Sequence, residues 1–280
     1  MAKISNWTVH NNISVRGKAN AGGVGFVVAS DIVLADQTAQ FSLSELLFGL
    51  FPALVLPFLI RRIGFQKAHC LTLMIQPISV EQAYAWGLVD ACDVQSESLL
   101  RKHLLRLRRL SKMGIIRYKR YMSRLYDWLL QSKSLAVAAN REVFSDPRNL
   151  EWIFRYAETG QISMDGLIHA NMLDSKGVGG KRVTMIQSVV DLHEVEPGIV
   201  QVTMQDRVHK NTFTEELILG LSQSFESIQA NSSYKVVILT GYDSYFASGG
   251  TQEGLLAIHE GKAKFSDTKI YSLALAVDLS

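Results

Sequence analysis

The sequence predicts an α/β fold, because strand-like and helix-like segments alternate along the chain. Residues 13–18 form a strand-like run that leads to the glycine pair Gly22 and Gly23. The segment that follows, residues 22–30, is small or branched and apolar throughout, as is typical of a buried helix. Near the other end, residues 185–275 show a ββαβα order of patterns. With 280 residues, 48% of them hydrophobic, the chain is long enough for one large domain or two small ones.

The part of the chain up to residue 161 is expected to continue with strands and then helices. The run IVLAD after Asp31 predicts a strand, and AQFSLSELLFG alternates like a half-buried strand that turns at Gly49 and Pro52. The further elements are predicted from their start and stop signals: helices over residues 57–64, 66–74 and 79–87, a short edge strand over 88–91, and a last helix from the Asp146-Pro147 turn to Gly160. Ser79 is the expected cap of the third helix, with Gln82 three residues later.

A new pattern begins after residue 185. It predicts a hairpin that turns at Pro197-Gly198, an amphipathic helix capped by Thr214, and a buried strand over residues 235–240. Glycine-rich turns then lead into another expected helix. The divisions of the chain are therefore predicted as residues 1–161, a linker over 162–184, and 185–280, with the first and last able to combine into one domain.

Composition and motif spacing argue against several classes of function. A net charge of +3 gives no general case for nucleic-acid binding. The GVGGKR stretch is not a phosphate-binding loop, because Arg182 stands where Ser or Thr is required. Histidine and cysteine spacing predicts no metal site, and Cys70 and Cys92, in apolar surroundings, are expected to be reduced core residues. The first residues lack an apolar export signal and no apolar run is long enough for a bilayer, so we expect a cytoplasmic protein without a membrane partner.

Residues 98–126 hold ten lysines and arginines and no acidic residue, interleaved with Leu and Tyr at helical spacing. One interpretation is a helix face that is simply solvated. The other is a docking surface for an acidic carrier protein or for the phosphates of a phosphopantetheine arm.

Two features of residues 15–52 point to chemistry. Gly22 and Gly23 are placed at the start of the expected buried helix, where unpaired N–H groups and the helix dipole favour an oxygen that becomes negative during a reaction. Glu45 follows among leucines, where burial raises the proton affinity of a carboxylate and suits it to act as a general base. The alternative from spacing alone is an exposed glutamate at a strand end.

The same stretch closely resembles the signature of the crotonase (enoyl-CoA hydratase/isomerase) superfamily. The residues that match the glycine-rich part of the signature are Gly17, Ala19, Gly22, Gly23, Asp31 and Ala35. The segment FSLSELLFGLFP carries Glu45 at the place where the family has a glutamate. Residues up to about 161 are most similar to enoyl-CoA hydratase-like enzymes of bacterial polyketide clusters, which act on carrier-protein thioesters. Residues 185–275 resemble the N-terminal part of the neighbouring decarboxylase or isomerase of those clusters.

The resemblance implies a crotonase-like ββα spiral in permuted order, with the C-terminal portion first and the N-terminal portion second. It implies that Glu45 is catalytic and that the N–H groups of Gly22 and Gly250 form an oxyanion hole, with Gly23 and Ala21 in substrate binding. It also implies a substrate carried as a phosphopantetheine or CoA thioester, no further cofactor, no metal, and a homotrimer.

One departure from the family narrows the expected reaction. Family hydratases that use two carboxylates place the second glutamate where this sequence has Gly25. The resemblance therefore favours dehydration, by a single glutamate, of a 3-hydroxyacyl thioester on an acyl carrier protein during polyketide β-branching. The alternative is an inactive in-frame fusion of two family fragments, which acts at most as a binding or oligomerisation partner.

Overall fold

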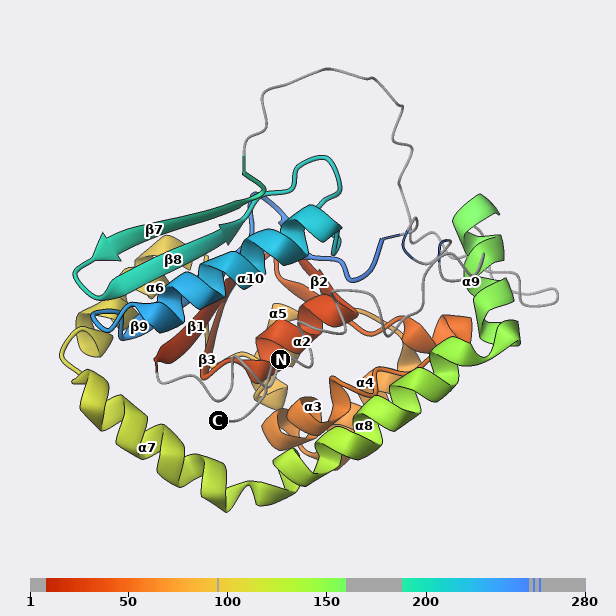
Figure 1. The fold of residues 1–280 in the computed structure, drawn as a ribbon, viewed down its shortest axis with the longest axis horizontal. Helices are drawn as coiled ribbons and strands as arrows, with labels where there is room; N and C mark the ends of the chain where they lie inside the picture. Colours follow the sequence, from red (N-terminus) through yellow and green to blue (C-terminus); the bar gives the residue numbers. More distant parts are fainter. Residues whose placement is uncertain (1–8, 95, 160–187, 252–253, 255–256, 258–280) are drawn as a thin grey trace.

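The computed structural model describes residues 9–94, 96–159, 188–251, 254 and 257. The predicted linker and the helix expected after Gly250 lie outside these residues, apart from single positions at the end. The described residues form a mixed α/β structure, in which two sheets are combined with helices (Figure 1).

The larger sheet contains strands from both ends of the chain. Its six strands follow the order β6-β3-β1-β9-β8-β7. They are β1 (His10–Val15), β3 (Ile32–Asp36), β6 (Ala91–Asp93), β7 (Val190–Glu196), β8 (Ile199–Met204) and β9 (Val236–Thr240). Strand β1 pairs in parallel with β3 on one side and with β9 on the other. The first and last parts of the sequence are thus neighbours at the centre of one sheet, which leaves neither with an unpaired edge there.

The smaller sheet repeats this pairing of distant segments. Its order is β10-β2-β4-β5. The strands are β2 (Lys18–Asn20), β4 (Gln40–Ser42), β5 (Ile78–Ser79) and β10 (Tyr245–Ala247). Strand β10 pairs in parallel with β2, and β2 pairs in parallel with β4. Three of these strands have only three residues and β5 has two, which is too short for an alternating pattern to predict them.

Two glycines near β2 and α2 allow the first part of the sequence to approach the last part closely. Gly17 has a φ of +63°, and a Cβ atom at this position would lie 1.7 Å from the backbone oxygen of Ser244. A Cβ atom on Gly23 would lie 2.4 Å from the backbone oxygen of Ala247. A side chain at either position would collide with the backbone of the segment around β10 and push it away.

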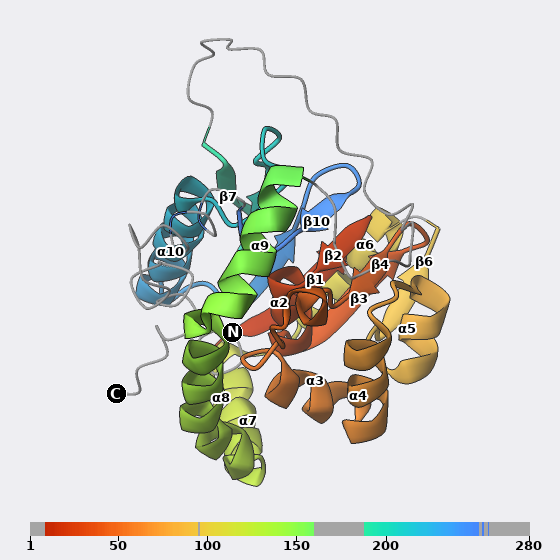
Figure 2. The same cartoon turned by 90° about the vertical axis from the view of Figure 1, so that its right-hand side faces the viewer.

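The helices cover both faces of the larger sheet. They are α2 (Gly22–Ala29), α3 (Leu56–Ile63), α4 (Phe65–Met74), α5 (Val80–Trp86), α6 (Ser96–Leu107), α7 (Lys112–Leu125), α8 (Asp127–Ser145), α9 (Pro147–Thr159) and α10 (Glu215–Ala230). Helices α2 and α10 bury their apolar side chains in the main core, together with Ile13, Val202 and Leu239 of the strands. On the other face, Leu104 and Leu107 of α6 pack in a smaller cluster with strands β8 and β9. Helices α7 and α8 extend along one border of the molecule (Figures 1 and 2). Helix α9 contacts the short 3-10 helix η1 (Glu45–Phe48).

Most of the predicted helices and strands are confirmed within a few residues, and the caps are confirmed as well. The Ser79 hydroxyl accepts a hydrogen bond from the N–H of Gln82, and the Thr214 hydroxyl accepts one from the N–H of Leu217. The predicted hairpin is formed by β7 and β8, whose antiparallel pairing brackets the turn at Pro197 and Gly198.

Three local predictions are wrong. The expected strand around Glu45 ends early: after β4 the chain forms the 3-10 helix η1 (Glu45–Phe48), closed by hydrogen bonds from Leu47 N to Ser44 O and from Gly49 N to Leu46 O. The edge strand begins at Ala91 rather than three residues earlier, because Leu88 still bonds back to helix α5. Cys70 and Cys92 are exposed rather than in the core, because each lies on the outward face of its element.

Candidate functional site

A tight turn joins strand β2 to helix α2. Strand β2 ends at Asn20, Ala21 has a φ of +48°, and the helix begins at Gly22. The N–H of Ala21 donates to the backbone oxygen of Ser42, which ties the turn to strand β4. The N–H groups in the first turn of a helix lack partners within the helix, so this turn presents donors together with the positive end of the helix dipole.

A second loop, from the last part of the sequence, lies against this turn. It follows strand β10 and contains Gly249, whose φ is +82°. A Cβ atom on Gly249 would lie 3.1 Å from the Cβ of Ala21 and 3.6 Å from the backbone nitrogen of Gly22. Among the atoms that the structure describes, a Cβ on the neighbouring Gly250 would meet nothing within 4 Å. The residues predicted as oxyanion donors, Gly22 and Gly250, therefore lie on adjacent segments, and Gly250 borders open space.

Phe213 connects the two loops. Its N–H donates to the backbone oxygen of Gly249 at 2.6 Å, and it forms an isolated parallel bridge with Gly250. Its ring lies over the start of α2, where a Cβ on Gly22 would be 2.5 Å from the ring edge. The ring also packs edge to face on Phe26, with centroids 5.6 Å apart.

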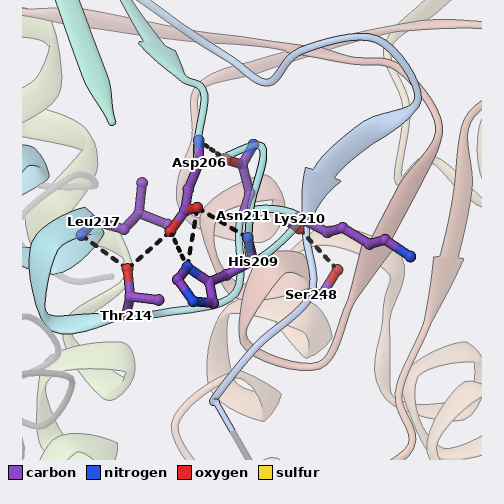
Figure 3. Close-up of polar contacts among 7 residues, drawn as sticks. All are labelled: Asp206, His209, Lys210, Asn211, Thr214, Leu217 and Ser248. Carbon is purple, nitrogen blue, oxygen red and sulfur yellow. Dashed lines mark hydrogen bonds and ion pairs between the residues drawn. The ribbon is translucent and has the colours of Figure 1, made fainter. Parts of the chain in front are cut away.

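The loop between β8 and α10 holds the second loop in place (Figure 3). The Asn211 side chain accepts from the N–H of Asp206 at 2.8 Å and donates to the backbone oxygen of Phe246 at 3.0 Å. The buried Asp206 carboxylate accepts from the N–H of His209 and from the hydroxyl of Thr214. These residues were not predicted as part of a site, although a run of polar residues directly after a strand was a signal that could have found them.

Glu45 is the first residue of η1 and is partly buried. Its Oε2 atom is buried and has no hydrogen-bond partner in the part of the chain that the structure describes. Burial raises the pKa of the Glu45 carboxyl from 4.5 to about 7, although the backbone N–H groups of Glu45 and Ser44 act in the opposite direction. The alternative of an exposed glutamate at a strand end is therefore excluded.

The pairing of β2 with β4 brings Glu45 toward the glycine turn. Asn20 is the register partner of Ser42, so the residue before Ala21 lies beside the segment that leads to Glu45. Gly25, at the place of a second family glutamate, is buried inside α2. The described residues contain no group of His, Cys, Asp and Glu that could hold a metal ion. The arrangement can thus stabilise a negative oxygen and move a proton near neutral pH.

A separate cavity of about 960 Å³ lies at the amino ends of the strands and is lined by residues of α3, α7 and α8. It contains Asp31, whose carboxylate accepts from Lys119 at 2.9 Å and from the backbone N–H of Asn11 at 2.8 Å. Burial lowers the pKa of Lys119, and Asp31 raises it. Arg62 is likewise paired with Asp90. The charged groups named here are therefore neutralised within the chain.

The basic residues of 98–126 fall into two groups: one bonds within the chain, and the other is exposed. Lys119 points inward to Asp31, and Lys112 donates to the backbone oxygens of Asn231 and Ser232. The other lysines and arginines of the run are exposed on α6, α7 and the segment between them.

No helix among the described residues is long and apolar enough to span a membrane.

Comparison with known proteins gives the following similarities. The profile of the enoyl-CoA hydratase/isomerase family matches residues 12–166 and 194–279, well over half of the chain. The bacillaene synthase dehydratase PksH of Bacillus subtilis is 65% identical over 147 residues, which are 52% of this chain and 57% of that protein. The bacillaene synthase decarboxylase PksI of the same organism is 60% identical over 95 residues, 34% of this chain and 38% of that protein. The two relatives match different parts of the chain.

A solved structure shows the same similarity in three dimensions. The crystal structure of a putative polyketide biosynthesis enoyl-CoA hydratase (pksH) from Bacillus subtilis superposes with a TM-score of 0.56 and 61% sequence identity. The superposition covers 57% of this chain and 64% of that one. The chain thus spans less than two thirds of the length of each of these relatives.

Proposed function

The chain belongs to the enoyl-CoA hydratase/isomerase family, and we propose that it is a lyase that dehydrates a 3-hydroxyacyl thioester during polyketide β-branching. Family membership, together with the mixed α/β architecture, confirms the predicted crotonase-like fold. We also propose that the portions occur in permuted order, C-terminal portion first. The support is that the similarity to a dehydratase and the similarity to a decarboxylase fall on different parts of the chain.

The observation that carries the proposal is the buried Oε2 atom of Glu45, which has no hydrogen-bond partner among the described residues and belongs to a carboxyl with a pKa of about 7. A carboxylate with this pKa is divided between its charged and neutral forms at neutral pH, so it can both take and return a proton. The Asp31 carboxylate, by contrast, is bonded to the Lys119 cation and to the N–H of Asn11.

In the proposed reaction, Glu45 removes a proton from the α-carbon of the thioester. The negative charge that develops on the thioester oxygen is stabilised by N–H groups of Gly22 and Gly250, and each such donor contributes about 2.7 to 4 kcal/mol in comparable sites. The β-hydroxyl group then leaves with the proton held by Glu45, which forms the α,β-double bond and one water molecule. Gly23 and Ala21 are proposed to take part in substrate binding.

The acyl group is proposed to arrive on the phosphopantetheine arm of an acyl carrier protein, or as a CoA thioester, without a further cofactor or metal. The exposed basic residues of α6 and α7 support docking of an acidic carrier protein by charge complementarity. A homotrimer in the cytoplasm is proposed as the working assembly.

A second candidate function follows from the same division of similarity. The chain can be an inactive fusion of two family fragments that binds a carrier protein or pairs with intact relatives. The observation that favours it is that the chain spans only 57% of the dehydratase relative and 38% of the decarboxylase relative.

The test is to incubate the purified chain with a 3-hydroxyacyl group loaded on a carrier protein and, separately, on CoA, and to follow loss of water by mass spectrometry. We expect dehydration, and we expect Glu45→Gln to lower the rate by about 10³-fold or more. Glu142→Gln, which changes an exposed glutamate on α8, is the matched control and leaves the rate unchanged. A monodisperse, cooperatively folded chain that removes no water from either substrate would favour the inactive fusion.

A further inference from the structure

A small polar network lies between the glycine turn and Glu45. The Oδ1 atom of Asn20 accepts from the Ser42 hydroxyl at 2.9 Å. The Asn20 amide nitrogen donates to the Ser44 hydroxyl at 3.3 Å, and the same hydroxyl lies 3.4 Å from Oδ1. One asparagine side chain on β2 thus contacts both serines that precede Glu45.

The position of Ser44 connects this hydrogen-bond network to Glu45. Strand β4 ends at Ser42, so the backbone pairing of β2 with β4 does not extend to Ser44. Ser44 precedes η1, and its backbone N–H stabilises the charged form of the Glu45 carboxyl. The amide of Asn20 therefore reaches beyond the sheet to the residue that contacts Glu45.

Asn20 is also joined directly to the other half of the site. It is followed by Ala21, whose N–H is bonded to Ser42, and then by Gly22 at the start of α2. We propose that Asn20 is a positioning residue, which holds the glycine turn and Glu45 in a fixed relative placement through its bonds to Ser42 and Ser44. This inference rests on the proposed function of the same site and deepens it.

The chemistry of the amide suits this task. An asparagine amide both accepts and donates, so it can serve two hydroxyl groups at once. An apolar residue of similar size would leave both serine hydroxyls without this partner, and the segment before Glu45 would be held only by backbone contacts.

The role of Asn20 can be observed through the pKa of Glu45, because the groups that shift this pKa are known. Burial and the N–H groups of Glu45 and Ser44 are the causes of its pKa shift in the described structure. Tyr156 of α9 packs on η1, where its ring lies 5.0 Å from that of Phe48, and burial raises its pKa. Tyr156 is neutral in the range where Glu45 titrates.

The experiment is a titration of the Glu45 carboxyl by NMR on the full chain with labelled glutamate, with the signal assigned by its absence in Glu45→Gln. It does not require turnover, so it stands even if the chain proves inactive. We expect Asn20→Ala to raise the pKa of Glu45 by about 0.5 or more, because a bond to the charged form is loosened. Ser44→Ala is expected to raise it in the same direction while keeping the bond between Asn20 and Ser42.

Gln201→Ala is the matched control, because it removes an amide-to-hydroxyl hydrogen bond of 3.1 Å, to Thr203, on the distant strand β8. It leaves the pKa of Glu45 unchanged. In an active chain, Asn20→Ala also lowers kcat by about 10-fold with little change in KM. An unchanged Glu45 pKa in both Asn20→Ala and Ser44→Ala would overturn the proposal. If Asn20→Ala does not fold, Ser44→Ala alone decides the matter.

Discussion

The two ends of the parallel strands place a carboxylate in different surroundings. At the amino ends, Asp31 lies in a cavity and is paired with Lys119 and with a backbone N–H. Beyond the carboxyl ends, Glu45 has a buried oxygen that finds no hydrogen-bond partner in the described part of the chain, and burial raises the pKa of its carboxyl to about 7. The difference teaches that the partners of an acid decide its role: the Asp31 carboxylate, bonded to Lys119, joins helix α7 to the strands, whereas the desolvated Glu45 carboxyl can take up a proton near neutral pH.

The largest expected effect on stability comes from Glu45, whose carboxyl is desolvated by burial. The folded-state pKa of Glu45 is raised above its value of 4.5 in the unfolded chain, so ionisation destabilises the folded state. This penalty is absent below about pH 4.5, grows as the pH rises, and is complete above about pH 7. Glu45→Gln removes it, so the unfolding free energy of the variant relative to the parent should rise by about 3 kcal/mol between about pH 4 and pH 8.

Urea unfolding of both proteins across this range measures the difference. Glu142→Gln provides the baseline for an exposed glutamate on α8. A difference between the Glu45→Gln variant and the parent that does not depend on pH would mean that Glu45 is not buried as described.

Removing the cation beside Asp31 should change the unfolding free energy by a smaller amount and in the opposite direction, toward lower stability. Lys119→Met removes the cation that is hydrogen-bonded to Asp31 and leaves the carboxylate with its bond from the N–H of Asn11. Loss of one partner of a fully buried ion pair costs about 3 to 5 kcal/mol, but the Asp31 side chain is 27% exposed, so we expect a loss of about 2 kcal/mol. Urea unfolding at pH 7 measures this loss, and an unchanged midpoint would show that the pair contributes nothing.

The smallest expected effect comes from neutralising both members of the pair. Adding Asp31→Asn to Lys119→Met removes the uncompensated charge and keeps an acceptor for the N–H of Asn11. The double variant should recover about 1 kcal/mol relative to Lys119→Met alone. A double variant no more stable than Lys119→Met would mean that packing of the lysine stem, rather than charge, holds α7 to the core.

Local patterns predicted the helices well and the site only in part. Helices α2 and α10 were predicted because an apolar run or an amphipathic pattern with a capping residue is a property of neighbouring residues. Glu45 was found through its leucine neighbours and through family resemblance, but its 3-10 helix was mistaken for strand. The hydrogen bonds of Asn20 to Ser42 and Ser44 lie between segments about two dozen residues apart, so no local pattern could reveal them.

By itself, the sequence determined most of the longer strands and helices, the caps at Ser79 and Thr214, and the residue types at the glycine turn, because these depend on nearest neighbours and on side-chain chemistry. Only the tertiary structure decided that β1 pairs with β9 and β2 with β10, and that Gly249 therefore lies beside Gly22. It also decided that the Glu45 carboxyl is desolvated by burial. Strand pairing and desolvation are set by segments that come together only when the chain folds. Thr240 and Ser14, for example, are 226 positions apart and share a hydrogen bond.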